Sequence, residues 1–220
     1  MAFTFTAVKQ GSVKNRVAEA IRNAIYSGKL HPGDPLLELQ LARDFRVSQT
    51  SVREALIHLE QLGLVRRYPN KGTVVTQLAP QQIRERLEIR MPLECMAALQ
   101  AVANLDEKHT AELLELADRI GAAVARNDHY AAAQADLEFH RTIWRLSGNE
   151  TLRQMLDQLA GPLVVFVSIV RSTHTGDLPS VLHSHREIVE ALAARDPKLI
   201  RDTIENHFTG SYEHFLRAAP

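Results

Sequence analysis

Three of the ten histidines stand where a helical pattern normally has an apolar side chain. The stripes that contain them are Ala133, Leu137, His140 and Trp144, then Val181, His185, Ile188 and Leu192, and finally Ile200, Ile204, His207 and Ser211. Asp136 precedes His140 by one helical turn, so both side chains can reach one point from the same helix. Three neutral imidazoles and a carboxylate suit a borderline divalent metal, with zinc or nickel ahead of manganese or iron. Such an ion keeps one or two coordination positions open.

Each of these histidines has an alternative interpretation, because a single histidine on an apolar face is more often a hydrogen-bonded packing residue than a ligand. The spacing of Asp136 and His140 is also not specific, since Glu54 and His58 repeat it. The combination favours a metal, because burying three imidazoles and a carboxylate separately would cost several desolvation penalties that one cation offsets. An open position on the ion could instead activate water or oxygen, which makes a metal-dependent enzyme the alternative function. No residue can be assigned as the general base of such an enzyme.

A second group of polar residues opens a helix that the sequence predicts between Ser48 and Gly63. The apolar positions of this helix recur at 3.6-residue spacing at Val52, Ala55, Leu56, Leu59 and Leu62. A shorter helix with apolar positions Leu37, Leu41, Ala42 and Phe45 precedes it, across a tight connection at Arg46-Val47. The pair is typical of a helix-turn-helix, whose second helix enters the major groove by its N-terminal end. The candidate DNA contacts at that end are Ser48, Gln49, Thr50, Ser51 and Arg53.

Arg53 is the strongest of these candidates, and Gln49 could reach an adenine edge. The serines and Thr50 can bond phosphates through hydroxyls or helix N-terminal amides. Two β-prone runs follow, 64–68 and 73–76, and the turn residues Pro69-Asn70-Lys71-Gly72 between them predict a hairpin, the wing of a winged helix.

Charge supports the same assignment. The chain is neutral overall, but residues up to Gln77 carry eleven basic against six acidic side chains, so the basic part is the one with the helix-turn-helix. Some winged helices only pack or bind protein. The positions of Arg53, Arg66, Arg67 and Lys71 argue against that alternative, because charge there would face a phosphate backbone.

The elements that must position these residues form two predicted domains in a mainly α protein. The first, 1–77, is the winged helix-turn-helix, with an additional helix that starts after a Ser12 cap and stops at Gly28. The second, 78–220, is an all-helical bundle in which helices are predicted at 81–104, 107–126, 128–146, 150–170, 178–194 and 197–217. Their joints carry the helix starts Asp106, Asp128, Asn149 and Asp196-Pro197. Kinks or breaks are predicted at Pro92 and at Gly161-Pro162.

Composition sets further bounds. A length of 220 residues with 45% hydrophobic content fits two modest domains. The longest apolar run, 163–170, is far below the roughly 20 residues of a membrane span, and 1–11 has no signal pattern, so we expect a cytoplasmic protein without membrane contact. The single cysteine, Cys95, excludes an intrachain disulfide and any multi-cysteine zinc site. A metal in this chain must therefore use histidine and carboxylate.

The N-terminal part resembles the GntR family of bacterial transcription regulators. The resemblance is carried by Pro32-Gly33, Leu41-Ala42, Val47-Ser48, Val52-Arg53-Glu54-Ala55-Leu56, Leu59, Gly63-Leu64-Val65, Gly72 and Val75. It implies binding to double-stranded operator DNA, with Lys71 and Gly72 at the wing tip as the minor-groove contact. It also implies a homodimer, which agrees with the fact that one recognition helix reads only a half-site. Better-known members have arginines where this chain has Leu39 and Gln49, so the resemblance does not give the operator sequence.

The C-terminal part resembles the FCD effector domain of the FadR-like branch of that family, a bundle of six or seven helices. The matching residues are Asp136, His140, His185 and His207, together with Arg90 and Glu94. The resemblance implies the metal-binding subgroup, in which a small organic acid reaches the open positions of the ion. Arg90 is then a candidate for the effector carboxylate, with simple pairing to Glu94 as the alternative. Arg171 is a weaker candidate, and His174, His183 and His214 are expected at the surface.

Overall fold

The structure, a computed structural model, describes residues 13–69, 72–173 and 178–217. Within these residues the N-terminal part has three helices and a small sheet. Its elements are α1 (Val13–Tyr26), β1 (Pro35–Leu36), α2 (Glu38–Phe45), α3 (Gln49–Gln61), β2 (Val65–Tyr68) and β3 (Gly72–Val75). The predicted cap Ser12, the N-terminal tail and Lys71 lie outside the described residues.

Local chemistry ends and starts these helices where the sequence predicts. At the turn, Arg46 adopts a left-handed φ of 54°, which ends α2. Ser48 then caps α3, because its hydroxyl accepts the backbone N–H of Ser51 at 3.1 Å. Gly63 follows α3 with a φ of 70°, a conformation that glycine adopts without strain. The recognition helix is therefore fixed at both ends.

The sheet confirms the predicted hairpin and adds a strand. Antiparallel β2 and β3 pair from Val65 with Val75 to Tyr68 with Gly72. On the other side of β3 lies β1, where Leu36 pairs with Thr73. A strand of two residues has no alternation to detect, so the sequence did not predict it.

The C-terminal part is the expected helical bundle. Its elements are α4 (Pro80–Ala101), a short 3₁₀ turn (Val102–Asn104), α5 (Glu107–Ala125), α6 (His129–Leu146), α7 (Glu150–Thr173), α8 (Leu178–Ala194) and α9 (Pro197–Arg217). The six predicted ranges agree with these helices to within a few residues. Both α4 and α7 run through their internal prolines, Pro92 and Pro162, so neither proline breaks its helix. None of the described helices is both long and apolar enough to cross a membrane.

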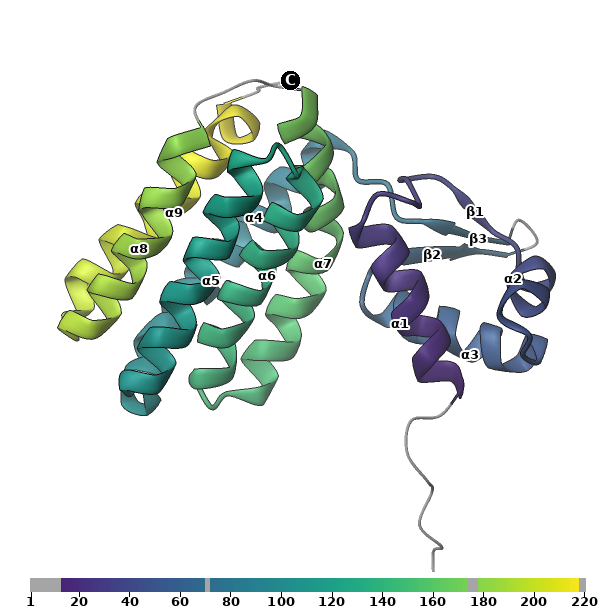
Figure 1. Cartoon of the computed structure of the whole chain (residues 1–220), viewed down its shortest axis with the longest axis horizontal. Helices are drawn as coiled ribbons and strands as arrows, with labels where there is room; N and C mark the ends of the chain where they lie inside the picture. The colour runs from purple at the N-terminus through teal and green to yellow at the C-terminus, as the bar shows by residue number, and fades with distance from the viewer. Residues whose placement is uncertain (1–12, 70–71, 174–177, 218–220) are drawn as a thin grey trace, which may run out of the picture.

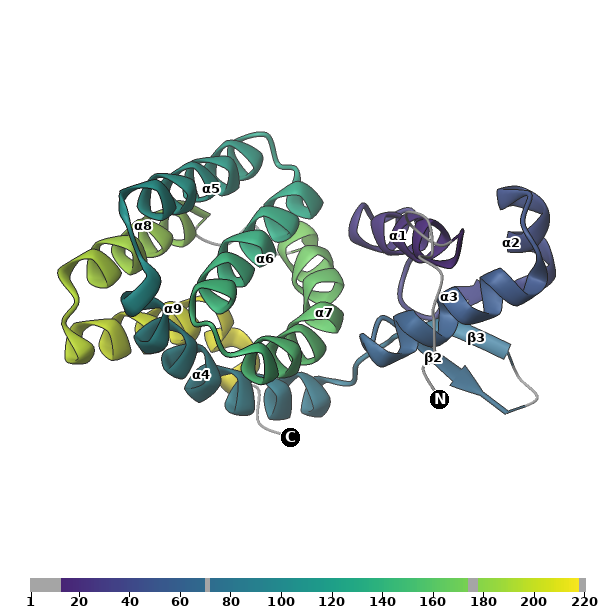
Figure 2. The ribbon, with the colours of Figure 1, turned by 90° about the horizontal axis from the view of Figure 1, so that it is seen from below.

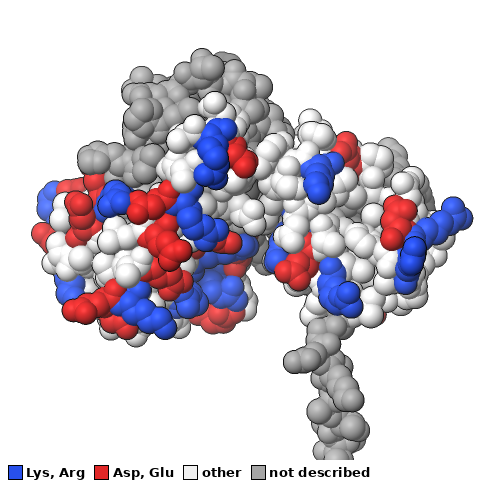
Figure 3. All heavy atoms as spheres, in the orientation of Figure 1, with Lys and Arg blue, Asp and Glu red and all other residues white. Residues whose placement is uncertain are grey.

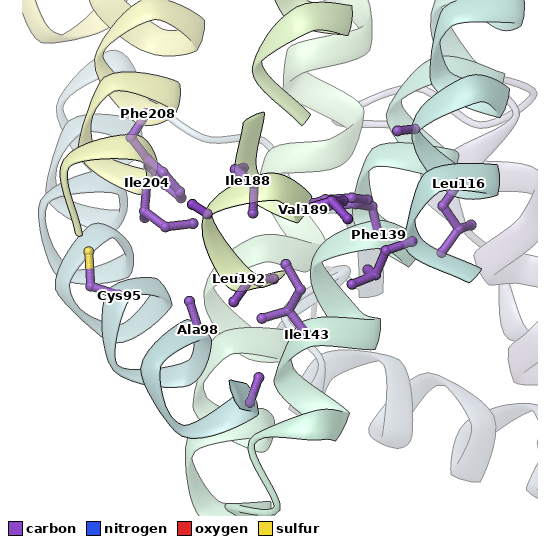
Figure 4. Close-up of a cluster of buried hydrophobic side chains, with 14 of the residues drawn as sticks. Cys95, Ala98, Leu116, Phe139, Ile143, Ile188, Val189, Leu192, Ile204 and Phe208 are labelled. Carbon is purple, nitrogen blue, oxygen red and sulfur yellow. The ribbon is translucent and has the colours of Figure 1, made fainter. Parts of the chain in front are cut away.

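The arrangement of the bundle determines which helices meet the N-terminal domain. Figures 1 and 2 show α6 and α7 on the side that faces α1, with α5 and α8 on the far side. The bundle has its own apolar core, in which Phe139, Ile143, Leu192 and Phe208 are buried together (Figure 4).

A second apolar cluster crosses the boundary between the domains. It joins Ile21 and Ile25 of α1 to Leu137 and Trp144 of α6 and to Leu156 of α7. The two domains therefore share an apolar cluster to which α1, α6 and α7 all contribute.

Candidate metal centre and DNA-binding surface

Three helices bring the predicted ligands together inside the bundle. The carboxylate of Asp136 and the imidazoles of His140, His185 and His207 offer one ligand atom each, and these four atoms lie within 4.8 Å of one another. The three imidazoles are buried, with at most 4% of any of these residues exposed. The Asp136 side chain is 15% exposed. Two of the ligands come from α6 and one each from α8 and α9, so an ion here would cross-link three helices.

The ligand atoms fit an ion in their spacing. Around an ion with bonds of about 2.1 Å, ligand atoms lie roughly 3 to 4 Å apart, so side-chain shifts of less than about 1 Å would close the set. The Nε2 atom of His185 is 3.0 Å from Oδ1 of Asp136. A bound ion would replace the proton that these two atoms share.

The outward nitrogens of two imidazoles have partners that orient the rings. Nδ1 of His140 lies 3.3 Å from Oε2 of Glu94, and Nδ1 of His207 lies 3.0 Å from Oγ of Ser184. When Nδ1 of a histidine is engaged in this way, Nε2 is left to ligate. The sequence pattern did not predict Ser184, because nothing in the periodicity distinguishes it.

His207 is held in the neutral form that binds metals. Burial lowers the pKa of its imidazole well below the ordinary value, and the neighbouring His185 and His140 lower it further. Because a proton and a metal compete for the same nitrogen, a depressed pKa favours the metal near neutral pH.

A buried ion pair on α4 adjoins the metal centre. The Arg90 guanidinium bonds Oε1 of Glu94 through Nε and Nη2, each at 2.8 Å. Burial by itself would raise the pKa of Glu94, but His140 and Arg90 together bring it down to about 2. The second oxygen of Glu94 accepts the indole N–H of Trp144 at 2.7 Å, besides facing His140. The charged Glu94 carboxylate thus contacts a candidate metal ligand, a tryptophan and an arginine at the same time.

Arg90 therefore makes the pair that was the alternative to effector binding. Its Nη1 also donates to the Tyr212 hydroxyl at 3.4 Å, and its guanidinium carbon lies 5.1 Å from the ring centre of Phe208. These contacts leave its predicted role toward an effector untested. The side chains of Arg171, His174, His183 and His214 lie outside the described residues.

The outer face of α5 and α6 is charged but balanced. Figure 3 shows acidic and basic side chains interspersed on this face of the bundle. Among them Arg119 pairs with Glu138 at 3.0 Å and Arg145 with Glu112 at 2.9 Å. Because each of these arginines already has an acidic partner, we assign no anion site to this face.

The predicted DNA contacts lie at the N-terminal end of α3 as expected. Ser48, Gln49, Thr50 and Arg53 are exposed, and Ser51 is half-buried. At the wing Gly72 has a φ of 87°, and a Cβ there would meet nothing within 4 Å. The residue that sequence analysis missed is Glu38, the first residue of α2, whose carboxylate contacts both Arg53 and Gln49.

Comparison with known proteins agrees with both domains. Residues 13–75 match the model of the gntR family of bacterial regulatory proteins, and residues 85–210 match the FCD domain. A probable D-xylose utilization operon transcriptional repressor from Paenarthrobacter nicotinovorans is 32% identical over 209 residues, which is 94% of this chain and 90% of that protein.

Solved structures show the same architecture. McbR/YncC of E. coli superposes with a TM-score of 0.82 at 24% identity, over 94% of this chain and 98% of that one. A putative GntR regulator from Rhodococcus sp. RHA1 superposes with a TM-score of 0.79 at 26% identity, over 96% of this chain and all of that one (100%). These relatives are regulators and not enzymes. The chain belongs to the GntR family of bacterial transcription regulators, with an FCD domain following its helix-turn-helix.

Proposed function

We propose that this regulator is a homodimer whose affinity for operator DNA is set by a small carboxylate bound at a metal ion in the C-terminal domain. The observation that supports this most strongly is the convergence of Asp136, His140, His185 and His207, with two of the imidazoles oriented by further partners. A buried cluster of this composition is costly without a cation. The enzyme alternative has no support in the family to which the chain belongs.

The proposed ion is zinc or nickel, with manganese or iron as further possibilities, because the donors are three nitrogens and one oxygen. When bound, the ion supplies a Lewis acid that anchors a carboxylate at its open positions. The chain itself keeps His207 neutral through burial, and it orients His140 through Glu94 and His207 through Ser184.

The proposed effector contacts are Arg90 and Arg171. Support for Arg90 comes from its position, because the Glu94 carboxylate joins its guanidinium to His140. An anion at the ion would gain from a guanidinium nearby, whereas a neutral ligand would not.

On the DNA side, the proposed contacts are Ser48, Gln49, Thr50, Ser51 and Arg53 of the recognition helix with Lys71 and Gly72 of the wing. The first four of the helix residues are at its N-terminal end, which enters the major groove in helix-turn-helix proteins. A dimer is proposed because each protomer offers one recognition helix, which reads only one half-site. The relative named as a probable repressor supports repression as the mode of action.

Elemental analysis of protein purified without an affinity tag tests the metal site. We expect about one ion per chain in the parent protein and a strong loss in a His185→Ala, His207→Ala double variant. A matched control is His31→Ala, His58→Ala, which removes two exposed imidazoles from the N-terminal domain. Full metal content in the His185→Ala, His207→Ala variant would contradict the assignment of these residues as metal ligands. A thermal-shift screen of the metal-loaded protein against dicarboxylates, sugar acids and aromatic acids then identifies the effector class, because native-state binding raises the melting temperature.

A further inference from the structure

We propose that Glu38 is a positioning residue for DNA reading, because its carboxylate aligns both Arg53 and Gln49 of the recognition helix for contact with base edges. Glu38 lies on α2 and the other two on α3, so the contacts join both helices of the helix-turn-helix. The inference rests on the proposed reading of DNA by α3.

The contact to Arg53 occupies one edge of the guanidinium. Nε of Arg53 is 3.1 Å and Nη2 is 2.8 Å from Oε2 of Glu38, which is the side-on arrangement. The opposite edge, made by Nη1 and the second N–H of Nη2, is not engaged by Glu38. That edge is the one that donates in parallel to O6 and N7 of guanine. Glu38 therefore holds Arg53 without using the donors that read a base.

Gln49 is also hydrogen-bonded to the Glu38 carboxylate. Its Nε2 donates one N–H to Oε2 of Glu38 at 3.1 Å. The amide keeps its oxygen and its second N–H, which together match N6 and N7 of adenine. One carboxylate thus orients two side chains of different base preference.

Fixing these side chains before DNA arrives lowers the cost of binding. The Arg53 side chain is 52% exposed, and an arginine in this position would otherwise lose rotamer freedom on binding. The Glu38 side chain is only 21% exposed, so it is the more constrained partner. Hydrogen bonding from Arg53 lowers the pKa of Glu38, with burial opposing, so the carboxylate is charged at neutral pH.

The location of Glu38 adds a second effect. Together with Arg67, Tyr68 and Gly72 it lines a hollow of about 370 Å³ between α2 and the wing, on the face that would meet DNA. A negative charge there repels phosphates and weakens binding to any sequence. The repulsion keeps non-specific binding weak, whereas the ratio of specific to non-specific affinity rises only through the alignment of Arg53 and Gln49.

The test is selection of a randomised duplex pool by the parent protein, followed by affinity measurements on the most enriched duplex and on an unselected one. The variant Arg53→Ala first identifies the base pair whose preference depends on Arg53. We expect Glu38→Gln to lower the preference at that same pair by roughly 5-fold to 100-fold, the range of one good bidentate contact. Affinity for the unselected duplex should stay equal or rise. In the Glu38→Gln, Arg53→Ala double variant, the preference should fall no further than in Arg53→Ala.

Asp44→Asn is the matched control, because Asp44 is an exposed acid on the same helix and its replacement removes the same charge. It should leave base preference intact. The proposal is overturned if Glu38→Gln keeps the full preference, or if it weakens selected and unselected duplexes equally with a lower melting temperature, which would make Glu38 a structural residue of α2. If the parent enriches no sequence, DNA reading itself fails and the role of Glu38 fails with it. Sequence enrichment with an unchanged Glu38→Gln profile contradicts this inference alone.

Discussion

At the scale of single residues, one carboxylate connects the candidate metal ligands to the rest of α4. Glu94 is 1% exposed and contacts His140, Trp144 and Arg90 at once. Each contact is a charge-assisted hydrogen bond or an ion pair with a group that is itself buried. Replacing Glu94 therefore changes the orientation of a ligand and the charge balance of Arg90 together.

The variant Glu94→Gln should weaken metal binding on the order of 10-fold to 100-fold while all four ligands remain, as loss of an outer partner of a ligating histidine does. It should also lower the free energy of unfolding by about 3 to 5 kcal/mol, because Arg90 stays buried without its charge partner. Competition with a chelator of known affinity measures the first effect, and denaturant titration measures the second. Glu88→Gln, an exposed acid on the same helix, is the control. Unchanged metal affinity with reduced stability would show that Glu94 only balances Arg90.

A variant of Arg90 distinguishes binding of the effector carboxylate from simple pairing with Glu94. In Arg90→Gln we expect metal content to be retained and binding of the carboxylates found by thermal shift to weaken, because the side chain still fills its site without its charge. Isothermal titration of the metal-loaded variant decides the question. Equal affinity in variant and parent would assign Arg90 to pairing with Glu94 alone. A matched control is Arg84→Gln, at a partly buried arginine earlier on α4.

At the scale of elements, the recognition helix depends on its first turn. We expect Arg53→Ala to cost about 1 to 3 kcal/mol of binding to a selected duplex if Arg53 makes a bidentate base contact. Fluorescence anisotropy at two salt concentrations distinguishes a base contact, which changes sequence preference, from a phosphate contact, which lowers the salt slope by about one. Arg46→Ala, an exposed arginine at the turn before α3, is the comparison variant. Unchanged affinity in Arg53→Ala would remove this residue from the DNA contact.

How much of the fold and of the candidate site could be predicted depends on how far apart in the sequence the interacting residues lie. The helices of both domains and the hairpin were predictable because their signals are local: apolar stripes at helical spacing, the Ser48 cap and the Gly63 stop. The cluster of Asp136 and three histidines could also be predicted, because each histidine interrupts an apolar stripe and Asp136 lies one turn before His140. Glu38 and Ser184 could not, since each is defined by a partner 11 to 23 residues away whose direction depends on how two helices pack.

Gly28 lies where the chain after α1 approaches α6, at the boundary between the two domains. Gly28, just after α1, has a φ of 71°, and a Cβ there would lie 2.1 Å from the ring of Tyr130 on α6. Gly28→Ala should lower stability for two reasons, the unfavourable left-handed conformation, at about 1 to 2 kcal/mol, and the clash with Tyr130.

The double variant Gly28→Ala, Tyr130→Ala separates these two costs, because it removes the clash and keeps the conformational strain. Gly210→Ala is the opposite control: a Cβ on this α9 residue meets nothing within 4 Å, and it should stabilise the helix by about 0.5 to 1 kcal/mol. Denaturant titration measures all of them. If Gly28→Ala is as stable as the parent, the close approach of α1 to α6 does not hold in solution.

At the scale of the whole molecule, α6 contributes both to the candidate metal centre and to the contact with the DNA-binding domain. The stripe that carries His140 toward His185 and His207 also carries Leu137 and Trp144, which belong to the cluster shared with α1. Trp144 also donates to Glu94, which contacts His140. Packed groups therefore lead continuously from the proposed ion site to the DNA-binding domain, through an element that both sites contact.

Removing the ion should weaken both stability and response. We expect chelation to lower the melting temperature, because a ligand present at 1,000 times its Kd contributes about 4 kcal/mol to the native state. It should also abolish the effect of the carboxylate on DNA affinity, since in the proposed function the ion anchors that ligand. Readdition of zinc or nickel should restore both. A melting temperature unaffected by chelation, in protein shown by elemental analysis to have lost its metal, would contradict a structural role for the ion.

The path between the domains can be tested apart from the site. Tyr130 contacts Gly28 across the boundary and is not among the candidate ligands. In Tyr130→Ala we expect metal content and carboxylate affinity to match the parent, while the fold-change in DNA affinity caused by the carboxylate becomes smaller. Linkage requires the converse as well, so DNA should alter carboxylate affinity less in this variant than in the parent. Leu199→Ala, at an exposed position of α9, is the control and should keep the full response. An undiminished response in Tyr130→Ala would show that this contact holds the domains together without coupling the two sites.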